Sequence, residues 1–323
     1  MANAVDAWWD ELQRPDPFLV VEAGAGMGSL AASVLAAAPA CGPALRYVTV
    51  ERSDRLRAAQ TDRLPVEMPS AVLGPVTRAE DEDDDGSGPA PRPGTGPLVT
   101  ALAELPAGPF TGVVLANELL DNLAFSLLER SDTGWKEIRV GENGGRLVEV
   151  AVDAAPDLAA AAERLAPGAP IGGRIPMQHS AQRWLRAAVG AVERGRVVVV
   201  DYASTTPEMA QRPGTEWLRT YRGHGRGGHP LEHPGQQDVT AEVAVDQLAR
   251  VAPPDVDVTQ AAFLSRHGLD ALVAEASAAW EVGAARPDLA ALRARSTVTE
   301  ARALTDPTGL GAFRVLEWIV PRQ

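Results

Sequence analysis

The feature that most constrains the fold is a glycine-rich turn between a short apolar run and a helix of small residues. Residues 18–22 are rich in branched side chains and predict a buried strand, whereas residues 29–37 predict a helix. Between them lie Gly24, Gly26 and Gly28. Because glycine allows sharp turns and close ligand approach, this strand–turn–helix predicts a ligand-binding crossover in an α/β sheet. A tight turn that merely needs small residues is the alternative interpretation.

Apolar runs and amphipathic segments alternate along much of the chain. Further strands are expected at 45–50, 71–76, 111–117, 196–201, 256–262 and 313–320, and helices at 1–17, 53–63, 100–105, 180–192, 241–250, 269–280 and 288–303. Strands that alternate with helices predict a doubly wound, mostly parallel α/β sheet with helices on both faces.

A β-rich stretch interrupts this alternation, and the sequence predicts an inserted cap at 126–195. Short runs there alternate as antiparallel strands do, and Asn143-Gly144 predicts a hairpin turn. The expected core is then formed by 1–125 and 196–323. The acidic, Pro/Gly-rich residues 80–97 predict a surface loop, and 203–240, without clear periodicity, predict a long functional loop.

The residues around the turn favour one cofactor. A dinucleotide fingerprint requires a third glycine where this chain has Ser29, and the preceding strand ends in an acid, Glu22. A carboxylate would repel a pyrophosphate but not a sulfonium ligand that carries an ammonium group. Glu51, at the end of the second strand, is expected to accept both ribose hydroxyls. The pattern therefore favours S-adenosylmethionine over NAD(P), although Glu51 alone is equally consistent with a solvated strand end.

A polar segment follows another buried strand, at the edge where a substrate would meet the cofactor. Asn117, Glu118 and Asp121 offer an amide and two carboxylates. Such groups can orient an amine or a guanidinium and help take up the proton released when a nitrogen is methylated. For Asp121, capping of a turn is an equally good interpretation.

Composition excludes several classes of function. The net charge of −13 argues against a nucleic-acid partner, and no apolar run is long enough to span a membrane. Cys41 is the only cysteine, which predicts no internal disulfide and a reducing compartment. With no basic or arginine-rich leader before the first strand, a cytoplasmic location is expected.

Several motifs together resemble the MidA-like family of class I S-adenosylmethionine-dependent methyltransferases, in an actinobacterial-type member. The family's acid-x-Gly-x-Gly-x-Gly turn and its Asn-Glu-Leu-Leu-Asp element are both present. The matching segments are 22–28, 117–121, 201–202, 214–224, 234–240, 259–264 and 310–316. The resemblance runs from about residue 18 to the end of the chain, and the combination is far more specific than any single motif.

The resemblance implies a Rossmann-like methyltransferase fold, S-adenosylmethionine as cofactor and a protein arginine as methyl acceptor. It implies that Glu22, Gly24, Gly26, Gly28, Glu51 and Asn117 bind the cofactor, that Asn117, Glu118 and Asp121 act in catalysis, and that Asp201, Tyr202, His224 and Asp238 contact substrate. Family members assist assembly of a respiratory complex, so a respiratory complex subunit is a candidate partner. A small-molecule methyltransferase and a non-catalytic assembly factor with a vestigial fold remain alternatives.

Departures from the family pattern concern the substrate site. Ala203 replaces a glycine, the Gly-Thr-Leu segment carries Glu216 and Trp217 as an insertion, and the family's Thr-Ser segment before the first strand is not in this sequence. Asp201 is expected to receive a proton or to pair with Arg222, and Trp217 and Tyr221 are candidates to line a pocket or to anchor the loop. The neighbouring histidines 224, 229 and 233 lack a helical frame, so no metal is expected.

Overall fold

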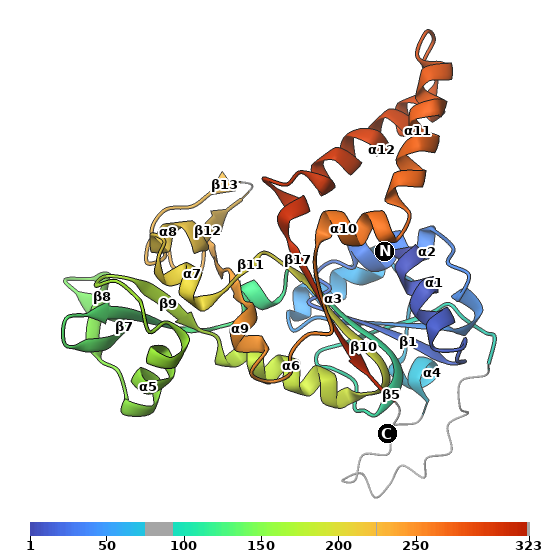
Figure 1. Cartoon of the computed structure of the whole chain (residues 1–323). Helices are drawn as coiled ribbons and strands as arrows, with labels where there is room; N and C mark the ends of the chain where they lie inside the picture. The colour runs from blue at the N-terminus through green and yellow to red at the C-terminus, as the bar shows by residue number, and fades with distance from the viewer. Residues whose placement is uncertain (75–92, 224, 322–323) are drawn as a thin grey trace, which may run out of the picture. The chain divides into compact units, whose positions relative to one another are not determined.

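The computed structural model describes residues 1–74, 93–223 and 225–321, which form two compact units (Figure 1). The first unit comprises Met1–Asn117, Ala188–Val200 and Pro254–Gln323, and the second comprises Glu118–Ala187 and Asp201–Pro253. The second unit is therefore larger than the expected insertion at 126–195. The reason is that 201–253 builds small sheets of its own rather than joining the central sheet.

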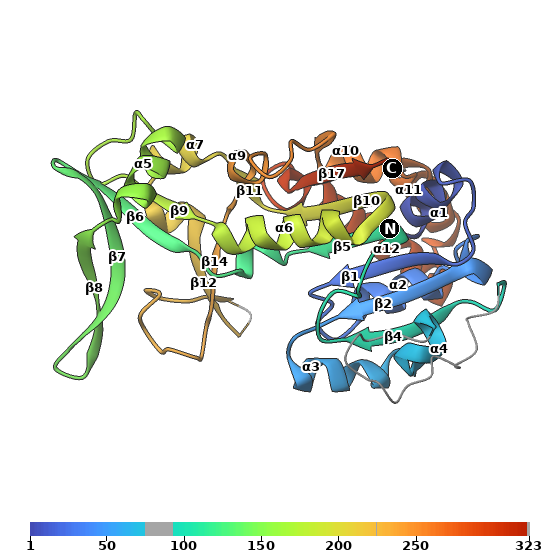
Figure 2. The same cartoon turned by 90° about the horizontal axis from the view of Figure 1, so that it is seen from below.

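An eight-stranded sheet forms the centre of the first unit. Its strands, in spatial order, are β3 (Val66–Glu67), β4 (Leu98–Leu102), β2 (Leu45–Val50), β1 (Phe18–Ala23), β5 (Phe110–Asn117), β10 (Val192–Asp201), β17 (Arg314–Val320) and β16 (Val256–Thr259). The pairings β3–β4, β4–β2, β2–β1, β1–β5 and β5–β10 are parallel, and β16–β17 is antiparallel. Figure 2 shows β1, β2 and β5 running together. This mostly parallel sheet confirms the predicted fold class.

The order of the strands identifies where a ligand can bind. From β1 the chain builds β2 and β4 on one side, and it then returns to place β5 and β10 on the other. The reversal puts a topological switch point between β1 and β5, and ligands of open α/β sheets bind beyond the carboxyl ends of strands at such points. The glycine turn follows β1 directly, and Asn117 ends β5.

Apolar side chains on one face of this sheet pack under three helices. These helices are α1 (Ala2–Glu11), α2 (Ser29–Ala36) and α10 (Gln260–Arg266). The buried cluster combines Trp8 and Phe263 from the helices with Phe18, Tyr47 and Val113 from the strands. Because the strands are buried on both faces, they appear in the sequence as continuous apolar runs, which is why β1, β2, β5 and β10 could be predicted. The remaining helices of the unit are α3 (Asp54–Ala59), α4 (Pro69–Leu73), α11 (Leu269–Gly283) and α12 (Leu289–Thr305).

Two predictions in the first half of the chain were wrong. Residues 71–73, expected as part of a strand over 71–76, belong to helix α4, which begins at Pro69; residues 75 and 76 lie outside the described residues. Residues 98–102, overlapping the helix expected at 100–105, form β4. Both are short apolar runs, and periodicity cannot separate helix from strand over five residues. The acidic residues 80–92 likewise lie outside the described residues.

An antiparallel sheet begins the second unit. Its order is β8 (Arg146–Asp153), β7 (Gly134–Asn143), β6 (Ser126–Ser131) and β9 (Arg174–Met177). The predicted hairpin is confirmed, but its turn lies one residue later than Asn143-Gly144: Asn143 pairs with Arg146, and Gly144 and Gly145 form the turn at φ +59° and +79°. Both values are in the left-handed region that a two-residue hairpin turn requires. Helix α5 (Pro156–Leu165) packs on this sheet, and α6 (His179–Ala191) leads back to the first unit.

The region predicted as a long loop, 203–240, contains several short elements instead. They are β11 (Ala203–Ser204), α7 (Thr206–Ala210), α8 (Gly214–Trp217), β12 (Leu218–Arg222), β13 (Gly225–Arg226) and β14 (Asp238–Ala241), followed by β15 (Val243–Ala244) and α9 (Val245–Leu248). Elements of two to five residues are too short to produce a detectable period. One signal was present: Thr205 and Glu208 form a capping box that starts α7.

None of the described helices combines the length and the apolar character that crossing a bilayer requires.

Candidate functional site

The glycine turn after β1 owes its shape to left-handed backbone at alternate positions. Gly24, Gly26 and Gly28 have φ values of +73°, +54° and +75°. The amides of Gly24 and Ala25 both donate to the carbonyl of Val50, at 2.9 and 3.1 Å, which ties the turn to the end of β2. Residues with a Cβ adopt such φ values at a cost, so the alternate glycines are a requirement of this backbone.

The surroundings of Gly26 and Gly28 differ. A Cβ added at Gly28 would lie 2.6 Å from Leu64 Cδ1, so a side chain there would have to displace the end of Leu64. A Cβ added at Gly26 would meet no atom within 4 Å. Gly26 therefore presents bare backbone to open space at the switch point, as expected where a ligand approaches the main chain.

Glu51 lies at the turn rather than at a solvated strand end. One carboxylate oxygen accepts a 2.9 Å hydrogen bond from the amide of Gly26, and the other accepts a 2.8 Å bond from the amide of Ser53. Each carboxylate oxygen has a second lone pair, so these bonds leave the group able to accept two hydroxyls. The sequence predicted Glu51 as a ribose ligand, and its position beside Gly26 is compatible with that role.

Glu22, near the end of β1, lies in a more buried environment than Glu51. Only 4% of its surface is exposed, and its carboxyl accepts a 2.7 Å hydrogen bond from the Tyr47 hydroxyl. Burial raises the pKa of Glu22 to about 7, although bonds from Tyr47 and the Ala31 amide oppose the shift. The structure thus gives Glu22 a packing role beneath the turn, and the sequence offered no sign of its Tyr47 partner.

This raised pKa makes folding stability depend on pH. Below about pH 4.5 Glu22 is protonated in both folded and unfolded chains, whereas between pH 4.5 and 7 the folded chain holds a proton that the unfolded chain has released. Its contribution to stability is therefore full at low pH and declines as pH rises to about 7. In the unmodified protein this effect should lower the free energy of unfolding by about 2–3 kcal/mol between pH 4.5 and 8. We expect Glu22→Gln to lack this pH dependence. Urea unfolding of both proteins at pH 4.5 and 8 measures it; a constant difference between them would contradict the assignment.

Gln60 is a further residue of this turn that sequence reasoning missed. Its side chain is fully buried, its amide nitrogen donates to the carbonyl of Gly26 at 2.8 Å, and its amide oxygen accepts from the Thr49 hydroxyl at 2.6 Å. The glycine turn is thus held at Gly26 from both sides, by Glu51 on the amide and by Gln60 on the carbonyl. A glutamine at the end of a predicted helix carries no signal of such a contact.

Asn117 shares the edge of the sheet with the turn. It is the last residue of β5, it is exposed, and it pairs in register with Val200 on β10. The preceding residue, Ala116, pairs with Ala23 at the end of β1. The predicted cofactor residues of the first unit therefore gather at the carboxyl ends of adjacent strands.

The second unit begins with a group of carboxyls. Glu118 has left-handed backbone at φ +51°, an uncommon conformation for a residue with a side chain. Asp121 and Asp201 are 3% and 1% exposed. Asp201 accepts hydrogen bonds from the amides of Leu120 and Asp121, at 3.1 and 3.3 Å, so it holds the segment that carries the other two acids.

Burial raises the pKa values of all three carboxyls, and repulsion adds to the shift of two of them. Burial is the main cause for each, and the negative charge of Asp121 adds to the shift of Glu118 and of Asp201. Arg222, the predicted ion-pair partner of Asp201, instead donates to the Gln236 side chain at 3.3 Å. The prediction of an Asp201–Arg222 pair was therefore wrong, because Asp201 bonds to backbone amides.

Tyr202 connects this group to the strand β14. Its hydroxyl donates to Asp121 at 2.7 Å and also bonds to the Thr240 hydroxyl. Because a phenol has one hydrogen, Thr240 donates to Tyr202 and Tyr202 donates to Asp121. Arg219 lies over the Tyr202 ring, 5.1 Å from its centroid. The result is a hydrogen-bonded chain from a threonine through a tyrosine to a buried carboxyl, and sequence reasoning did not identify Thr240.

The remaining predicted site residues are divided among the surface, the core and the part of the chain outside the described residues. Asp238 is exposed at the start of β14, opposite Tyr221 on β12, and His224 lies outside the described residues. Trp217 is fully buried in an apolar cluster, so it is a core residue and not a pocket lining. His229 lies 3.6 Å from Glu149, and the described residues contain no group of side chains able to hold a metal ion.

A mostly parallel sheet with a glycine turn at its switch point, an acid (Glu51) directly after β2 and an amide (Asn117) at the end of β5 is the arrangement of a class I methyltransferase fold. Residues 1–262 match the family described as "Putative S-adenosyl-L-methionine-dependent methyltransferase", and the chain belongs to this family.

Two solved structures from Burkholderia thailandensis support the fold. An uncharacterised protein is 26% identical over 98% of this chain and 77% of its own, with a TM-score of 0.76. A member of the same superfamily, described as a "likely methyl transferase" and bound to S-adenosyl-homocysteine, is 26% identical over 98% of this chain and 74% of its own, with a TM-score of 0.73. A comparison with curated proteins found no match.

Proposed function

We propose that the protein transfers a methyl group from S-adenosylmethionine to a nitrogen of a protein arginine side chain. The observation that carries the cofactor assignment is the open space above Gly26, where bare backbone and the Glu51 carboxylate adjoin. Family membership and the relative bound to S-adenosyl-homocysteine support the same cofactor. Gly24, Gly26, Gly28, Glu51 and Asn117 are the residues that would hold it.

The carboxyls of the second unit support a cationic acceptor. Within the described residues no ion pair involves Glu118, Asp121 or Asp201, so no basic side chain there already occupies the place of a guanidinium. A carboxylate can bind a guanidinium through two parallel hydrogen bonds, which fixes the orientation of its nitrogens. Together with the resemblance to the MidA-like family, this favours arginine over a neutral acceptor.

The chain's own residues would orient the acceptor and take up a proton. S-adenosylmethionine supplies a methyl group that its sulfonium charge already activates, so the protein's contribution is mainly alignment and charge placement. Glu118 and Asp121 would hold the guanidinium. The raised pKa values of these carboxyls favour acceptance of the proton that leaves the nitrogen after methylation. Asp201 would position both acids through the Leu120 and Asp121 amides.

The acceptor can be identified with radiolabelled cofactor and a protein extract. We expect label in protein bands and, after acid hydrolysis, in methylarginine. Label only in small metabolites would instead indicate a small-molecule methyltransferase on the same scaffold. Calorimetry with S-adenosylhomocysteine addresses the remaining alternative, because a chain that binds none at high micromolar concentration would be a non-catalytic assembly factor.

The partner would then be a protein that presents an arginine, and a respiratory complex subunit is the partner that the resemblance suggests. Co-purification of the labelled band with this chain would identify that partner directly.

A further inference from the structure

The helical hairpin α11–α12 of the first unit buries little of its own surface. In helices of 15 and 17 residues, the buried residues are Ala276, Ala291 and Ala301. Figure 1 shows the hairpin extending away from the sheet of its unit. Helices in proteins are stabilised mainly by packing of an apolar face, and three alanines supply little of it. A hairpin of this kind is expected to be covered by another surface.

Large apolar side chains are exposed at the tip of the hairpin. Val282, near the end of α11, is 90% exposed, and Leu289, at the start of α12, is 74% exposed. Leu292, one turn further along α12, is 47% exposed. Removing aliphatic side chains from water is favourable, so an exposed cluster of this kind is a candidate contact.

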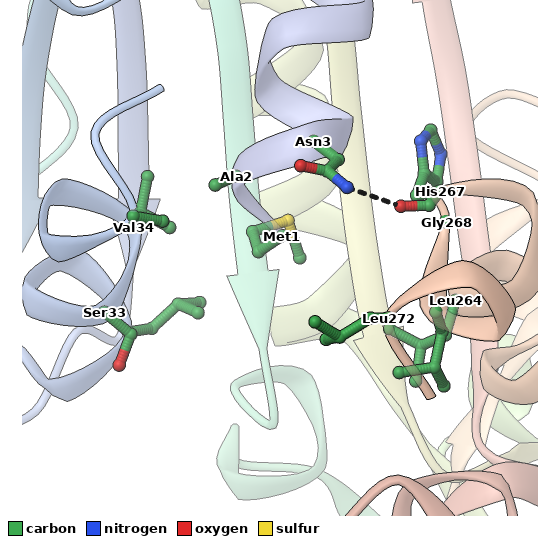
Figure 3. A pocket seen from close by; sticks show the side chains of 12 residues that line it. Met1, Ala2, Asn3, Ser33, Val34, Leu264, His267, Gly268 and Leu272 are labelled. Carbon is green, nitrogen blue, oxygen red and sulfur yellow. Dashed lines mark hydrogen bonds between the residues drawn. The ribbon is translucent and has the colours of Figure 1, made fainter. Parts of the chain in front are cut away.

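An apolar cavity of about 420 Å³ lies at the other end of α11. Figure 3 shows Leu264 and Leu272 on one side of it and Ser33 and Val34 on the other, with Met1 between them. The side-chain amide of Asn3 in its wall already donates to the carbonyl of His267 at 3.0 Å. Leu272 lines the cavity and is 51% exposed, so the cavity opens beside the base of the hairpin.

The two helices of the hairpin carry opposite charge. Helix α11 contains Asp270, Glu275 and Glu281 and no basic residue, whereas α12 contains three arginines and one glutamate. Within the part of the chain that the structure describes, no ion pair joins the two helices. An antiparallel copy of the hairpin would place an acidic helix beside a basic one and so match these charges.

We propose that the hairpin and the cavity form an interface between two copies of this chain, in which the tip of each hairpin enters the cavity of the other. A two-fold axis makes both contacts at once, since each copy supplies one tip and one cavity. The 15 residues of α11 span about 22 Å, so antiparallel hairpins bring each tip to the base of the other. The proposal is independent of methyl transfer.

Disulfide cross-linking tests this arrangement. In the double variant Val282→Cys/Leu272→Cys the two positions lie ten residues apart on one helix, about 15 Å, which is beyond the reach of a disulfide within one chain. Cys41 is buried and does not compete. We expect a dimer mass by light scattering for the unmodified chain and a covalent dimer after oxidation of the double variant.

Matched variants decide the outcome. Met68 is 72% exposed in the same unit, so Met68→Cys/Leu272→Cys should give no covalent dimer. Val282→Asp should weaken dimerisation at least tenfold while the circular dichroism spectrum is unchanged, and Met68→Asp should leave the dimer intact. A monomeric unmodified chain would overturn the proposal, as would equal cross-linking by both double variants or cross-linking by Val282→Cys alone.

Discussion

Gly26→Val is expected to abolish measurable binding of S-adenosylhomocysteine, with a loss of affinity of at least a hundredfold. A Cβ at this position meets no atom of the protein within 4 Å, so the side chain would extend into the open space assigned to the cofactor. Isothermal titration calorimetry measures the effect directly, and Gly26→Ala should give a smaller loss.

Gly144→Val is the matched control for this variant. Gly144 has φ +59° against +54° at Gly26, and a Cβ there also meets nothing within 4 Å. The two substitutions therefore introduce similar backbone strain and no clash with the chain, and they differ only in whether a ligand occupies the space. Equal affinity in Gly26→Val and Gly144→Val would refute the placement of the cofactor, provided that thermal unfolding shows both proteins folded.

Glu118→Gln is expected to slow methyl transfer by a factor of about 10²–10⁴, the usual contribution of a positioned proton acceptor, while S-adenosylhomocysteine affinity stays within twofold. The substitution keeps the shape of the side chain and removes its charge. It therefore tests the carboxylate and not the packing. Initial rates of label transfer to protein, together with calorimetry, separate the two effects.

The pH profile gives this test a second readout. Burial and the neighbouring Asp121 raise the pKa of Glu118, so the rate of the unmodified protein should rise with pH through a range above that of an ordinary glutamate. Glu118→Gln should lack this rise. Glu193→Gln, an exposed carboxyl near the start of β10, should keep both the rate and the profile. An unchanged rate and pH profile in Glu118→Gln would remove Glu118 from the site.

Sequence patterns predicted the elements whose signals are local. The strand β1, the glycines and helix α2 are contiguous, and each residue type there favours the backbone conformation found at its own position. The hairpin that turns at Gly144 and Gly145 was predictable to within one residue for the same reason. Residues 71–73 and 98–102 were assigned wrongly because a five-residue apolar run fits a helix and a buried strand equally well, and only pairing with a neighbouring strand distinguishes them.

By itself the sequence determined the α/β alternation, the glycine turn and the positions of Glu51 and Asn117 at strand ends, because these follow from local periodicity and backbone preference. Only the tertiary structure decided that Glu22 is buried against Tyr47 and that Thr240, Tyr202 and Asp121 form one hydrogen-bonded chain. Tyr202 is 81 residues from Asp121 and 38 from Thr240. Contacts over such separations depend on how strands are ordered in space, which no local pattern encodes.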